Sequence, residues 1–414
     1  MGWRKAMGSC LALTLCAPAA SAGALPRGPN WVGSWAASVQ VPEAGNSLAP
    51  GELRDATLRQ IVHLSIGGSA VRVHISNAFG TASLHLTSVH IARPASASSP
   101  QIDAATDRAL TFSRLAAVTI PAGAEYISDP IGFPAAAQSN LAITFHFDEA
   151  PVGETSHPGS RATSYLVHGD HVADADLPGA MRFDHWFNLQ GVEVSAPPGA
   201  AAIVALGDSI TDGHGSTTNG NDRWPDDLAR RLLAAMPARP LGVLNQGMGG
   251  NRLLLDGLGP NALARFDRDV LAQPGVRYLI VEEGINDIGA FGREGSQAES
   301  AHAALVDRIG GAYEQIVRRA HAHGIRVWGG TLTPFSGSAY YQPGPLSEAD
   351  REAVNRWIRT PGHFDAVVDF DKWLRDPARP EQLRPAYDSG DHLHPSPAGY
   401  RVMAKAVSLA DFAP

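Results

Sequence analysis

Two hydrophobic patterns divide this chain of 414 residues. From residue 30 to about residue 194, apolar and polar side chains alternate over short stretches such as Leu141–Phe147 and Ser164–His168, which is typical of β-strands with one buried face. After residue 200, continuous aliphatic runs are separated by stretches of helical periodicity, which is typical of βαβ units. The pattern predicts an all-β part followed by an α/β part.

The all-β part, residues 30–194, is predicted to form a sandwich or jelly-roll-like domain, because its short strands are punctuated by turn residues at close spacing. One example is the pair of alternating runs Leu64–Ile66 and Val71–Ile75, which flank Gly67-Gly68-Ser69. Two glycines between alternating runs favour a tight turn, so we predict that these two strands form a β-hairpin.

The α/β part, residues 200–414, is predicted to form a three-layer α/β/α domain around a largely parallel sheet. The Pro- and Gly-rich link Ser195–Ala200 is too short to let the two domains move far apart. Ser347, with Asp350 three residues later, is predicted to cap a helix that ends near Ile358. The other predicted helices and strands are Trp224–Met236, Gly242–Leu244, Arg277–Val281, Glu299–Ala322, Ile325–Trp328, Ala366–Phe370 and Pro397–Leu409.

The first 22 residues are predicted to be a signal peptide. Arg4 and Lys5 precede an apolar stretch, and Ala20-Ser21-Ala22 has the small residues that signal peptidase recognises. We therefore expect cleavage after Ala22 and a secreted or periplasmic protein. The apolar stretch, Met7–Ala17, is shorter than the roughly 20 residues needed to cross a bilayer, so no stable membrane anchor is expected.

Composition excludes several partners and chemistries. The 41 Asp and Glu outnumber the 33 Lys and Arg, and the net charge of -8 argues against nucleic acid or an anionic membrane surface as a partner. Both cysteines, Cys10 and Cys16, lie within the predicted signal peptide. The mature protein would therefore lack disulfides, a thiol nucleophile and cysteine-bound zinc.

The clearest candidate for chemistry is a serine at the end of a predicted buried strand. The aliphatic run Ala201–Gly207 suits a parallel strand that is covered on both faces, and it stops at Asp208-Ser209. Because functional residues gather at the carboxyl ends of such strands, Ser209 is a candidate nucleophile. A serine hydroxyl also needs a base to take its proton and donors to stabilise the resulting oxyanion.

Later segments can supply these partners. Asp391 stands three residues before His394, a spacing that lets the carboxylate fix the tautomer of the imidazole while the other ring nitrogen faces Ser209. Asn245–Asn251 and Glu283–Asp287 each follow an apolar run, so each is expected at the carboxyl end of a strand, where it can offer oxyanion donors.

These four segments, in this order, resemble the conserved blocks of the SGNH (GDSL) hydrolase superfamily over roughly the C-terminal half of the chain. The resemblance implies that Ser209 is the nucleophile, His394 the base and Asp391 the acid that orients it. Ile210 stands where the family motif usually has leucine, a difference that leaves the chemistry unchanged.

The same resemblance implies an oxyanion hole. Its donors would be the backbone N–H of Ser209, the backbone N–H of Gly250 and the side-chain amide of Asn286. Gly247 and Gly249 remain alternatives to Gly250, because a shift of one residue in this loop changes which N–H points inward.

Some other polar residues suggest different chemistry but fit it poorly. Asp391, His392 and His394 could be ligands of a metal, yet no His-x-x-x-His or His-Glu-x-x-His helix supplies a further ligand, so we expect neither a metal nor a cofactor. Glu282 and Glu283 are adjacent in a strand, so they face opposite sides and cannot flank one glycosidic bond.

Three polar residues of the all-β part, His157, Arg161 and Tyr165, lie near a Pro-Gly loop that could reach the cleft. We interpret them as surface polar residues, because polar side chains beside loops are usually exposed.

The N-terminal segments Trp31–Ala36 and Ser76–Gly80 resemble those of a bacterial subgroup of SGNH hydrolases with an added β domain, related to xylan-cluster esterases. This resemblance implies a serine esterase for acetyl or other short-acyl esters, with a small molecule or a polysaccharide as substrate. The alternatives are a lipase or arylesterase, an O-acetyltransferase, and a carbohydrate-binding or adhesion protein whose hydrolase domain is not catalytic.

Overall fold

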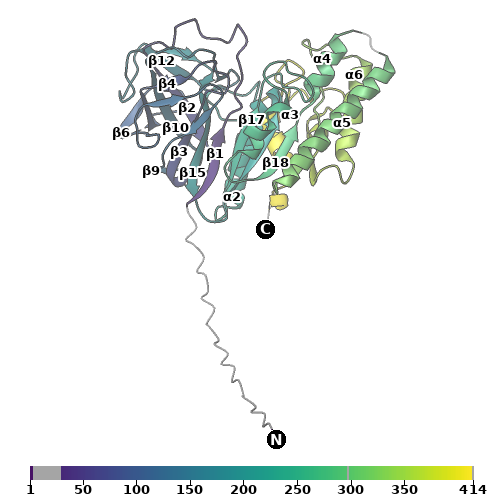
Figure 1. The fold of residues 1–414 in the computed structure, drawn as a ribbon. Coiled ribbons are helices and arrows are strands. Elements are labelled where there is room, and N and C mark those ends of the chain that lie inside the picture. The colour runs from purple at the N-terminus through teal and green to yellow at the C-terminus, as the bar shows by residue number, and fades with distance from the viewer. Residues whose placement is uncertain (3–28, 296–297, 413–414) are drawn as a thin grey trace.

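The computed structural model describes residues 1–2, 29–295 and 298–412, and it places an all-β region beside an α/β region (Figure 1). Apart from its first two residues, the predicted signal peptide lies outside the described residues. In the described part of the chain, no helix is both long and apolar enough to cross a membrane.

Two antiparallel sheets form the β region, as the alternating pattern predicts. Alternate residues of β3 and β10, including Val73 and Ile143, are buried in one hydrophobic cluster to which both sheets contribute. One sheet has the order β1 (Asn30–Ala36), β15 (Leu189–Ala196), β3 (Gly68–Ser76) and β8 (Glu125–Ile127), with β9 (Ile131–Ala135) also paired to β3. The other has the order β13 (Met181–Phe183), β12 (Ser164–His168), β2 (Ala56–Leu64), β10 (Ser139–Phe147), β5 (Ser88–Pro94) and β6 (Ile102–Ala109). Two short ladders join β11 (Ser156–His157) to β14 (Trp186–Phe187) and β4 (Leu84–Leu86) to β7 (Val118–Ile120).

The hairpin predicted at Gly67-Gly68-Ser69 is wrong. Strand β2 pairs with β10 and β12, whereas β3 pairs with strands of the other sheet, so this link carries the chain from one sheet to the other. Both glycines lie where the backbone passes close to other strands. A Cβ on Gly67 would lie 2.5 Å from the Ala135 oxygen, and one on Gly68 would lie 2.7 Å from the Ser195 oxygen.

A parallel five-stranded sheet forms the centre of the α/β region, which confirms that part of the predicted fold. Its order is β17 (Leu241–Gly247), β16 (Ala201–Gly207), β18 (Val276–Glu282), β19 (Arg326–Gly330) and β20 (Ala366–Val368). Both faces are covered, because neighbouring residues of β19 meet different elements: Gly329 packs against Phe364 and Gly330 against Phe370. The helices are α1 (Ser209–Asp212), α2 (Trp224–Ala235), α3 (Ala262–Phe266), the π-helix Asp267–Leu271, α4 (Ile285–Arg293), α5 (Glu299–Ala322), α6 (Pro345–Arg359), α7 (Phe370–Leu374), α8 (Pro397–Ala406) and the 3-10 helix Leu409–Phe412.

Two local predictions in this region need correction. Helix α6 begins at Pro345 with Gly344 as its N-cap, so Ser347 lies within the helix and does not cap it. Asp350 instead faces another helix, where its Oδ2 lies 2.5 Å from Nδ1 of His302. Strand β20 ends at Val368, and Phe370 begins α7.

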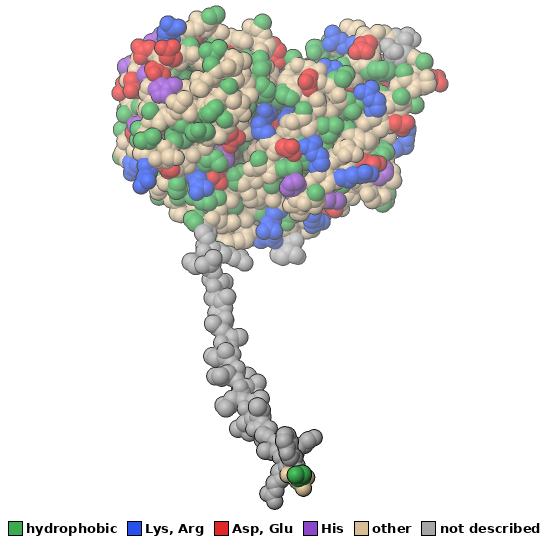
Figure 2. Space-filling view, in the orientation of Figure 1, with side chains coloured by type: hydrophobic (Ala, Val, Ile, Leu, Met, Phe, Trp, Pro, Cys, Tyr) green, Lys and Arg blue, Asp and Glu red, His purple; other side chains and the backbone are tan. Residues whose placement is uncertain are grey.

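The β region covers one edge of the parallel sheet. Strand β1 lies beside the edge strand β17 (Figure 1), and the backbones approach so closely that a Cβ on Gly242 would lie 2.1 Å from the Gly33 oxygen. The N–H of Val243 donates to Oγ of Ser65 at 3.0 Å, so a side chain of the β region pairs with the edge. The outer surface, in contrast, carries charges of both signs scattered over the face shown in Figure 2.

Candidate active site

The turn after β16 presents Ser209 at the carboxyl edge of the sheet. Asp208 caps α1 by accepting the Ile210 N–H at 2.9 Å, and Gly213, with a left-handed φ of 106°, ends the turn. Gly207 has no room for a side chain, since a Cβ there would lie 2.3 Å from Oγ1 of Thr211. This tight turn holds the Ser209 side chain at the end of a fully buried strand.

The structure brings together the three side chains of the predicted triad. Oγ of Ser209 lies 2.8 Å from Nε2 of His394, and Nδ1 of His394 lies 2.6 Å from Oδ2 of Asp391. Because a carboxylate can only accept, Nδ1 carries the proton and Nε2 is left to accept the serine hydroxyl. The chain of bonds therefore has the polarity needed for removal of the Ser209 proton.

The carboxylate of Asp391 is fixed and kept ionised by the loop that carries it. Its Oδ1 accepts the backbone N–H groups of His394 at 2.8 Å and Leu393 at 3.0 Å. Partial burial alone would raise the pKa of Asp391, but the hydrogen bonds from His394 and Leu393 outweigh it and hold the pKa well below its usual value.

Backbone N–H groups that could stabilise an oxyanion lie in the nucleophile turn and in the glycine loop that follows β17. Within the described residues, the N–H groups of Ser209, Gly249 and Gly250 have no hydrogen-bond acceptor. The N–H of Gly247 is different, because it donates to Oδ1 of Asn245 at 2.9 Å. Gly250 has a left-handed φ of 67°, and Leu258 fills the space where its Cβ would lie. The N–H of Gly247 therefore already has an acceptor, whereas the N–H groups of Gly249 and Gly250 are both available to an oxyanion.

Asn286, at the start of α4, is held rigidly at the same loop. Its Nδ2 donates to the Asn251 oxygen at 2.7 Å, and its Oδ1 accepts the Tyr341 hydroxyl at 2.6 Å. These two bonds fix the orientation of the amide and leave one N–H of Nδ2 for another acceptor. Asn286 is buried, bonded to the residue that follows Gly250, and does not line the open cleft.

The family of this part of the chain follows from a direct match. Residues 205–402 match the model of the GDSL-like lipase/acylhydrolase family. The C-terminal region is a GDSL-like acylhydrolase domain. The protein is therefore a carboxylic ester hydrolase.

Solved structures similar to the acylhydrolase domain cover about half of the chain. An acetyl xylan esterase from Geobacillus stearothermophilus is 22% identical, covers 50% of this chain and 93% of its own, and has a TM-score of 0.37. A GDSL-like lipase from Bacteroides thetaiotaomicron is 17% identical, covers 51% of this chain and 89% of its own, and has a TM-score of 0.37. No curated protein matches the chain.

A cleft of ≈ 470 Å³ opens above Ser209, between the acylhydrolase domain and the β region. Most of the residues that line it are polar or charged by type, and Leu258 is its one large aliphatic side chain. The acylhydrolase domain contributes Ser209, Asp212, His214, Gly249 and Leu258 to the lining, and the β region contributes Gln40, Glu43, Asn46, His157, Pro158, Gly159, Arg161, Asp184 and His185.

The cleft corrects our interpretation of three residues of the β region. His157 and Arg161, interpreted as surface polar residues, both line the cleft. His157 is buried and bonded to Asp212 of the nucleophile turn, and Arg161 donates to Nδ1 of His214 at 2.6 Å. Tyr165 is buried in β12 and does not line the cleft.

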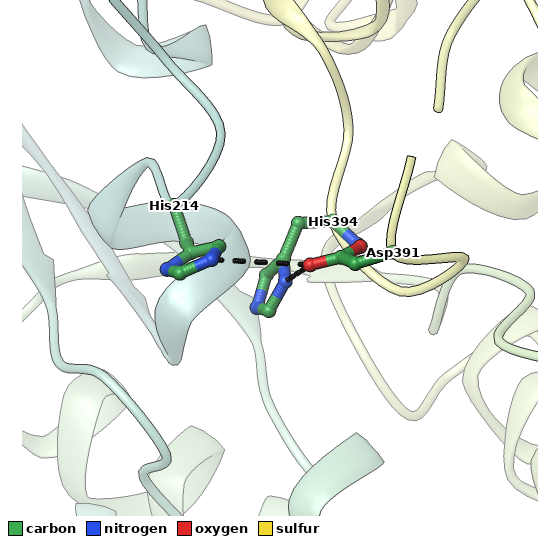
Figure 3. Close-up of side chains that lie close together, drawn as sticks. All are labelled: His214, Asp391 and His394. Carbon is green, nitrogen blue, oxygen red and sulfur yellow. Dashed lines mark hydrogen bonds and ion pairs between the residues drawn. The ribbon is translucent and has the colours of Figure 1, made fainter. Parts of the chain in front are cut away.

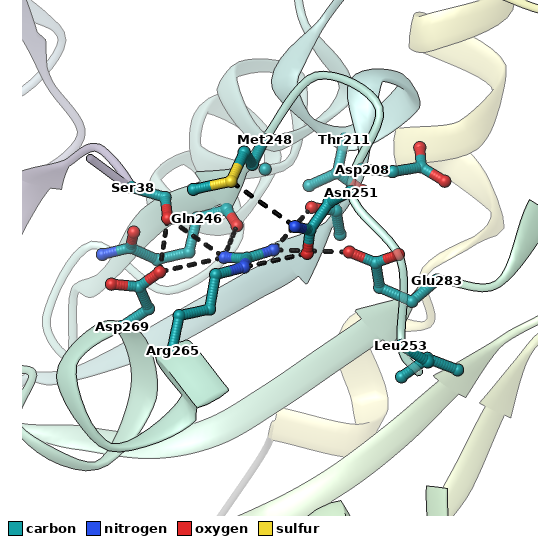
Figure 4. A network of polar contacts seen from close by, with 12 residues as sticks. Ser38, Asp208, Thr211, Gln246, Met248, Asn251, Leu253, Arg265, Asp269 and Glu283 are labelled. Atoms are coloured by element: carbon teal, nitrogen blue, oxygen red, sulfur yellow. Dashed lines mark hydrogen bonds and ion pairs between the residues drawn. The ribbon is translucent and has the colours of Figure 1, made fainter. Parts of the chain in front are cut away.

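Arg265 of α3 connects the chain segments that carry the site (Figure 4). The sequence pattern did not reveal this role. Its guanidinium is fully buried and donates to the backbone oxygens of Gly207 at 2.9 Å and Gln246 at 2.7 Å, at the ends of β16 and β17. Its Nε donates to Oδ1 of Asn251 at 2.9 Å. One buried cation therefore holds the nucleophile strand and the glycine loop together.

A group of buried acids lies in the same part of the domain as Arg265. Glu282 and Glu283 are fully buried, away from the cleft, which agrees with a structural role. Burial, with the neighbouring carboxylates, raises the pKa of both well above its usual value and raises the pKa of Asp208 to about 7. Arg265 donates to Oε1 of Glu283 at 3.3 Å and forms an ion pair with Asp269 at 3.0 Å.

His214, Asp391 and His394 point toward one another (Figure 3), and His214 lines the cleft. Each offers one possible metal-ligand atom, and these atoms lie within 4.8 Å of one another. Two of the three residues are already joined by the 2.6 Å bond of the His394–Asp391 pair, so the hydrogen bonds account for the cluster. His392 is not part of it, because its Nδ1 bonds to Asp388.

Proposed function

We propose that the protein is a secreted serine esterase that hydrolyses short-acyl esters of the acetyl type, with a carbohydrate or another hydroxyl-rich alcohol as the leaving group. The observation that carries the proposal is the continuous chain of hydrogen bonds from Ser209 through His394 to Asp391, at 2.8 and 2.6 Å. Nucleophile, base and orienting acid in this geometry are what acyl transfer requires.

The acylation step uses His394 twice. Its Nε2 takes the Ser209 proton while Oγ attacks the ester carbonyl, and Asp391 stabilises the imidazolium that forms. The tetrahedral intermediate then collapses, the bond to the alcohol oxygen breaks, and Nε2–H protonates the departing alcohol. Water attacks the acyl-enzyme with the same help from His394 and releases the acid and free Ser209.

The negative charge of the tetrahedral intermediate needs fixed donors. We assign this role to the N–H of Ser209, the N–H of Gly250 and the remaining N–H of the Asn286 amide. Two observations support this assignment: the backbone N–H groups have no other acceptor among the described residues, and two hydrogen bonds fix the orientation of the Asn286 amide. Donors that are already oriented need no reorganisation when the charge develops.

The lining of the cleft supports a small polar substrate over a long-chain lipid. A long acyl chain needs a continuous apolar surface, whereas this cleft offers Leu258 beside Glu43, Arg161, Asp184 and other polar side chains. A short acyl group fits beside Leu258, and hydroxyl groups of the alcohol can bind the polar wall.

The β region would then be an accessory sandwich domain, residues 30–194, that supplies this polar wall to a hydrolase domain spanning residues 200–414. We further propose that residues 1–22 direct export and are removed after Ala22. Mass spectrometry of the protein recovered from culture medium or periplasm tests the cleavage site.

Ester hydrolysis by purified protein tests the proposal. We expect acetate release from p-nitrophenyl acetate and acetylated xylan, and a decline in kcat/KM from acetate through butyrate to octanoate. Ser209→Ala should reduce the rate to the uncatalysed background. Wild-type activity in the Ser209 variant would refute the mechanism, a preference for octanoate would indicate a lipase, and acetylated sugar as the main product would indicate a transferase.

A further inference from the structure

A cation from the β region is linked to the proposed triad through one histidine. Arg161 donates from its guanidinium to Nδ1 of His214 at 2.6 Å. On the other side of the same ring, Nε2 of His214 lies 3.8 Å from Oδ2 of Asp391, and the ring centroid lies 4.1 Å from that of His394 (Figure 3). His214 thus lies between the Arg161 guanidinium and the His394–Asp391 pair.

The charge of Arg161 determines the tautomer of His214. A guanidinium has no acceptor and does not deprotonate in proteins, so Nδ1 must be the unprotonated nitrogen of the ring. The ring proton is then on Nε2 and faces the carboxylate of Asp391. Partial burial, the neighbouring His394 and Arg161 lower the pKa of His214 to about 4, so the ring is neutral at pH 7.

The backbones of both residues are held independently of their side chains. Arg161 has a left-handed φ of 48°, which is uncommon for arginine, and its carbonyl accepts the Asn219 N–H at 2.8 Å. The His214 N–H donates to the Ser209 oxygen at 2.9 Å, and its carbonyl accepts the Tyr400 hydroxyl at 2.6 Å. Replacing either side chain therefore leaves the backbone bonds of both loops in place.

We propose that Arg161 and His214 are positioning residues, which hold the His394–Asp391 pair in its productive orientation and limit the access of water to its carboxylate. The proposal rests on the proposed serine esterase mechanism. The side chain of Asp391 is 41% exposed, so water can reach the carboxylate that orients His394. The ring of His214 packs against the ring of His394 beside this carboxylate.

The physical effect follows from the solvation of Asp391. Without the His214 ring, water competes for Oδ2 and weakens the stabilisation of the imidazolium in the transition state. The ring of His394 also loses a packing neighbour and populates other orientations. The alcohol of p-nitrophenyl acetate has no sugar hydroxyl groups to bind the polar wall, so with this substrate kcat should fall while KM stays close to its original value.

Kinetics of single and double variants test this effect. We expect His214→Ala and Arg161→Met each to lower kcat for p-nitrophenyl acetate about 3- to 10-fold, and Arg161→Lys to recover part of the loss because it restores the cation. If Arg161 acts through His214, the double variant should be no slower than His214→Ala alone. Fold losses that multiply in the double variant would overturn the proposal.

Two matched controls separate this effect from a general change in stability. His171, a half-exposed histidine paired with Asp174 in the β region, and Arg182, an exposed arginine of β13, lie outside the cleft. His171→Ala and Arg182→Met should retain the kcat of the original protein. A similar loss of kcat in these controls would overturn the specific role of Arg161 and His214.

Proton NMR gives a second readout that a purely structural role would not change. The Nδ1–H proton of His394, bonded to Asp391, should give a low-field signal in the unsubstituted protein and in His214→Phe, which keeps an aromatic cover. In folded His214→Ala, exchange with water should broaden this signal. An unchanged signal and unchanged kcat in His214→Ala would refute the inference alone, whereas full activity in Ser209→Ala would refute the serine esterase itself.

Discussion

Nε2 of His157 lies 2.8 Å from Oδ1 of Asp212, so a histidine of the β region is bonded directly to the turn that carries Ser209. Both side chains are buried, and Nδ1 of His157 bonds to the Ser38 oxygen at 2.7 Å. Burial lowers the pKa of His157, but the attraction of Asp212 outweighs it and raises the pKa above its usual value. A buried ion pair therefore connects the two regions at the site.

Loss of this ion pair should destabilise the protein. His157→Ala leaves Asp212 buried without its partner, and we expect the free energy of unfolding to fall by about 3 kcal/mol. Because the pKa of His157 is raised in the folded state, the contribution is complete below the unfolded pKa of about 6.5 and disappears as the pH rises through the folded value. Urea unfolding at several pH values measures it, and a loss no larger than that of His171→Ala would contradict the prediction.

Removal of the Asn286 amide should slow catalysis more than removal of its support. Asn286→Ala deletes the proposed oxyanion donor, which is typically worth about 3 kcal/mol, so kcat should fall ~100-fold or more. Tyr341→Phe removes only the hydroxyl that bonds to Oδ1 of Asn286, and we expect a loss of about 3- to 10-fold. Steady-state kinetics with p-nitrophenyl acetate compares the two. Equal losses would show that Asn286 acts through packing alone.

Replacement of Arg265 should lower the stability of the acylhydrolase domain. Arg265→Met leaves Glu283 without its buried partner, leaves Asp269 with Arg268 as its one remaining arginine partner, and frees the ends of β16 and β17, so we expect a loss of about 3–5 kcal/mol in the free energy of unfolding. Arg319→Met is the matched control, because Arg319 pairs with the exposed Asp267, and it should cost less than about 1 kcal/mol. Chemical denaturation measures both, and comparable values would refute the central role of Arg265.

A histidine of β3 should make stability depend on pH. Burial alone would lower the pKa of His74, but hydrogen bonds and charge from Glu125 and Glu193 raise it to about 9. A raised folded pKa stabilises the protein fully below about pH 6.5, and this stabilisation, of about 3 kcal/mol, is lost as the pH rises to about 9. Thermal unfolding between these limits should show the decline in Tm. The decline should be much smaller in His74→Gln, and an equal decline would contradict the assignment.

Local patterns predicted the parts of the fold that depend on neighbouring residues in sequence. The helix Glu299–Ala322 has the predicted bounds, and the aliphatic run Ala201–Gly207 is a buried parallel strand. The hairpin at Gly67-Gly68-Ser69 failed because alternation and glycines describe two strands and a bend, but not the sheet to which each strand belongs. That choice depends on pairing with β10 and β15, which lie far away in the sequence.

The candidate site shows the same division. Ser209, Asp391 and His394 were predicted to meet because the serine ends a recognisable strand and the acid stands at a fixed spacing from the histidine, and the structure brings the three side chains together. Arg161 and His214 were not assigned a role, because no spacing relates two residues that meet only when the β region packs against the acylhydrolase domain. The one local signal was the His214 position between two glycines directly after the nucleophile turn.

The contact between β1 and β17 also limits how the protein can be engineered. A chain that begins near residue 200 would lack Ser65, so the N–H of Val243 in β17 would lose its acceptor. It would also lack β1, so the edge of the parallel sheet would be exposed. Such a fragment should self-associate instead of behaving as a free-standing catalyst. The β region can be replaced by another domain only if the replacement also covers the edge strand β17.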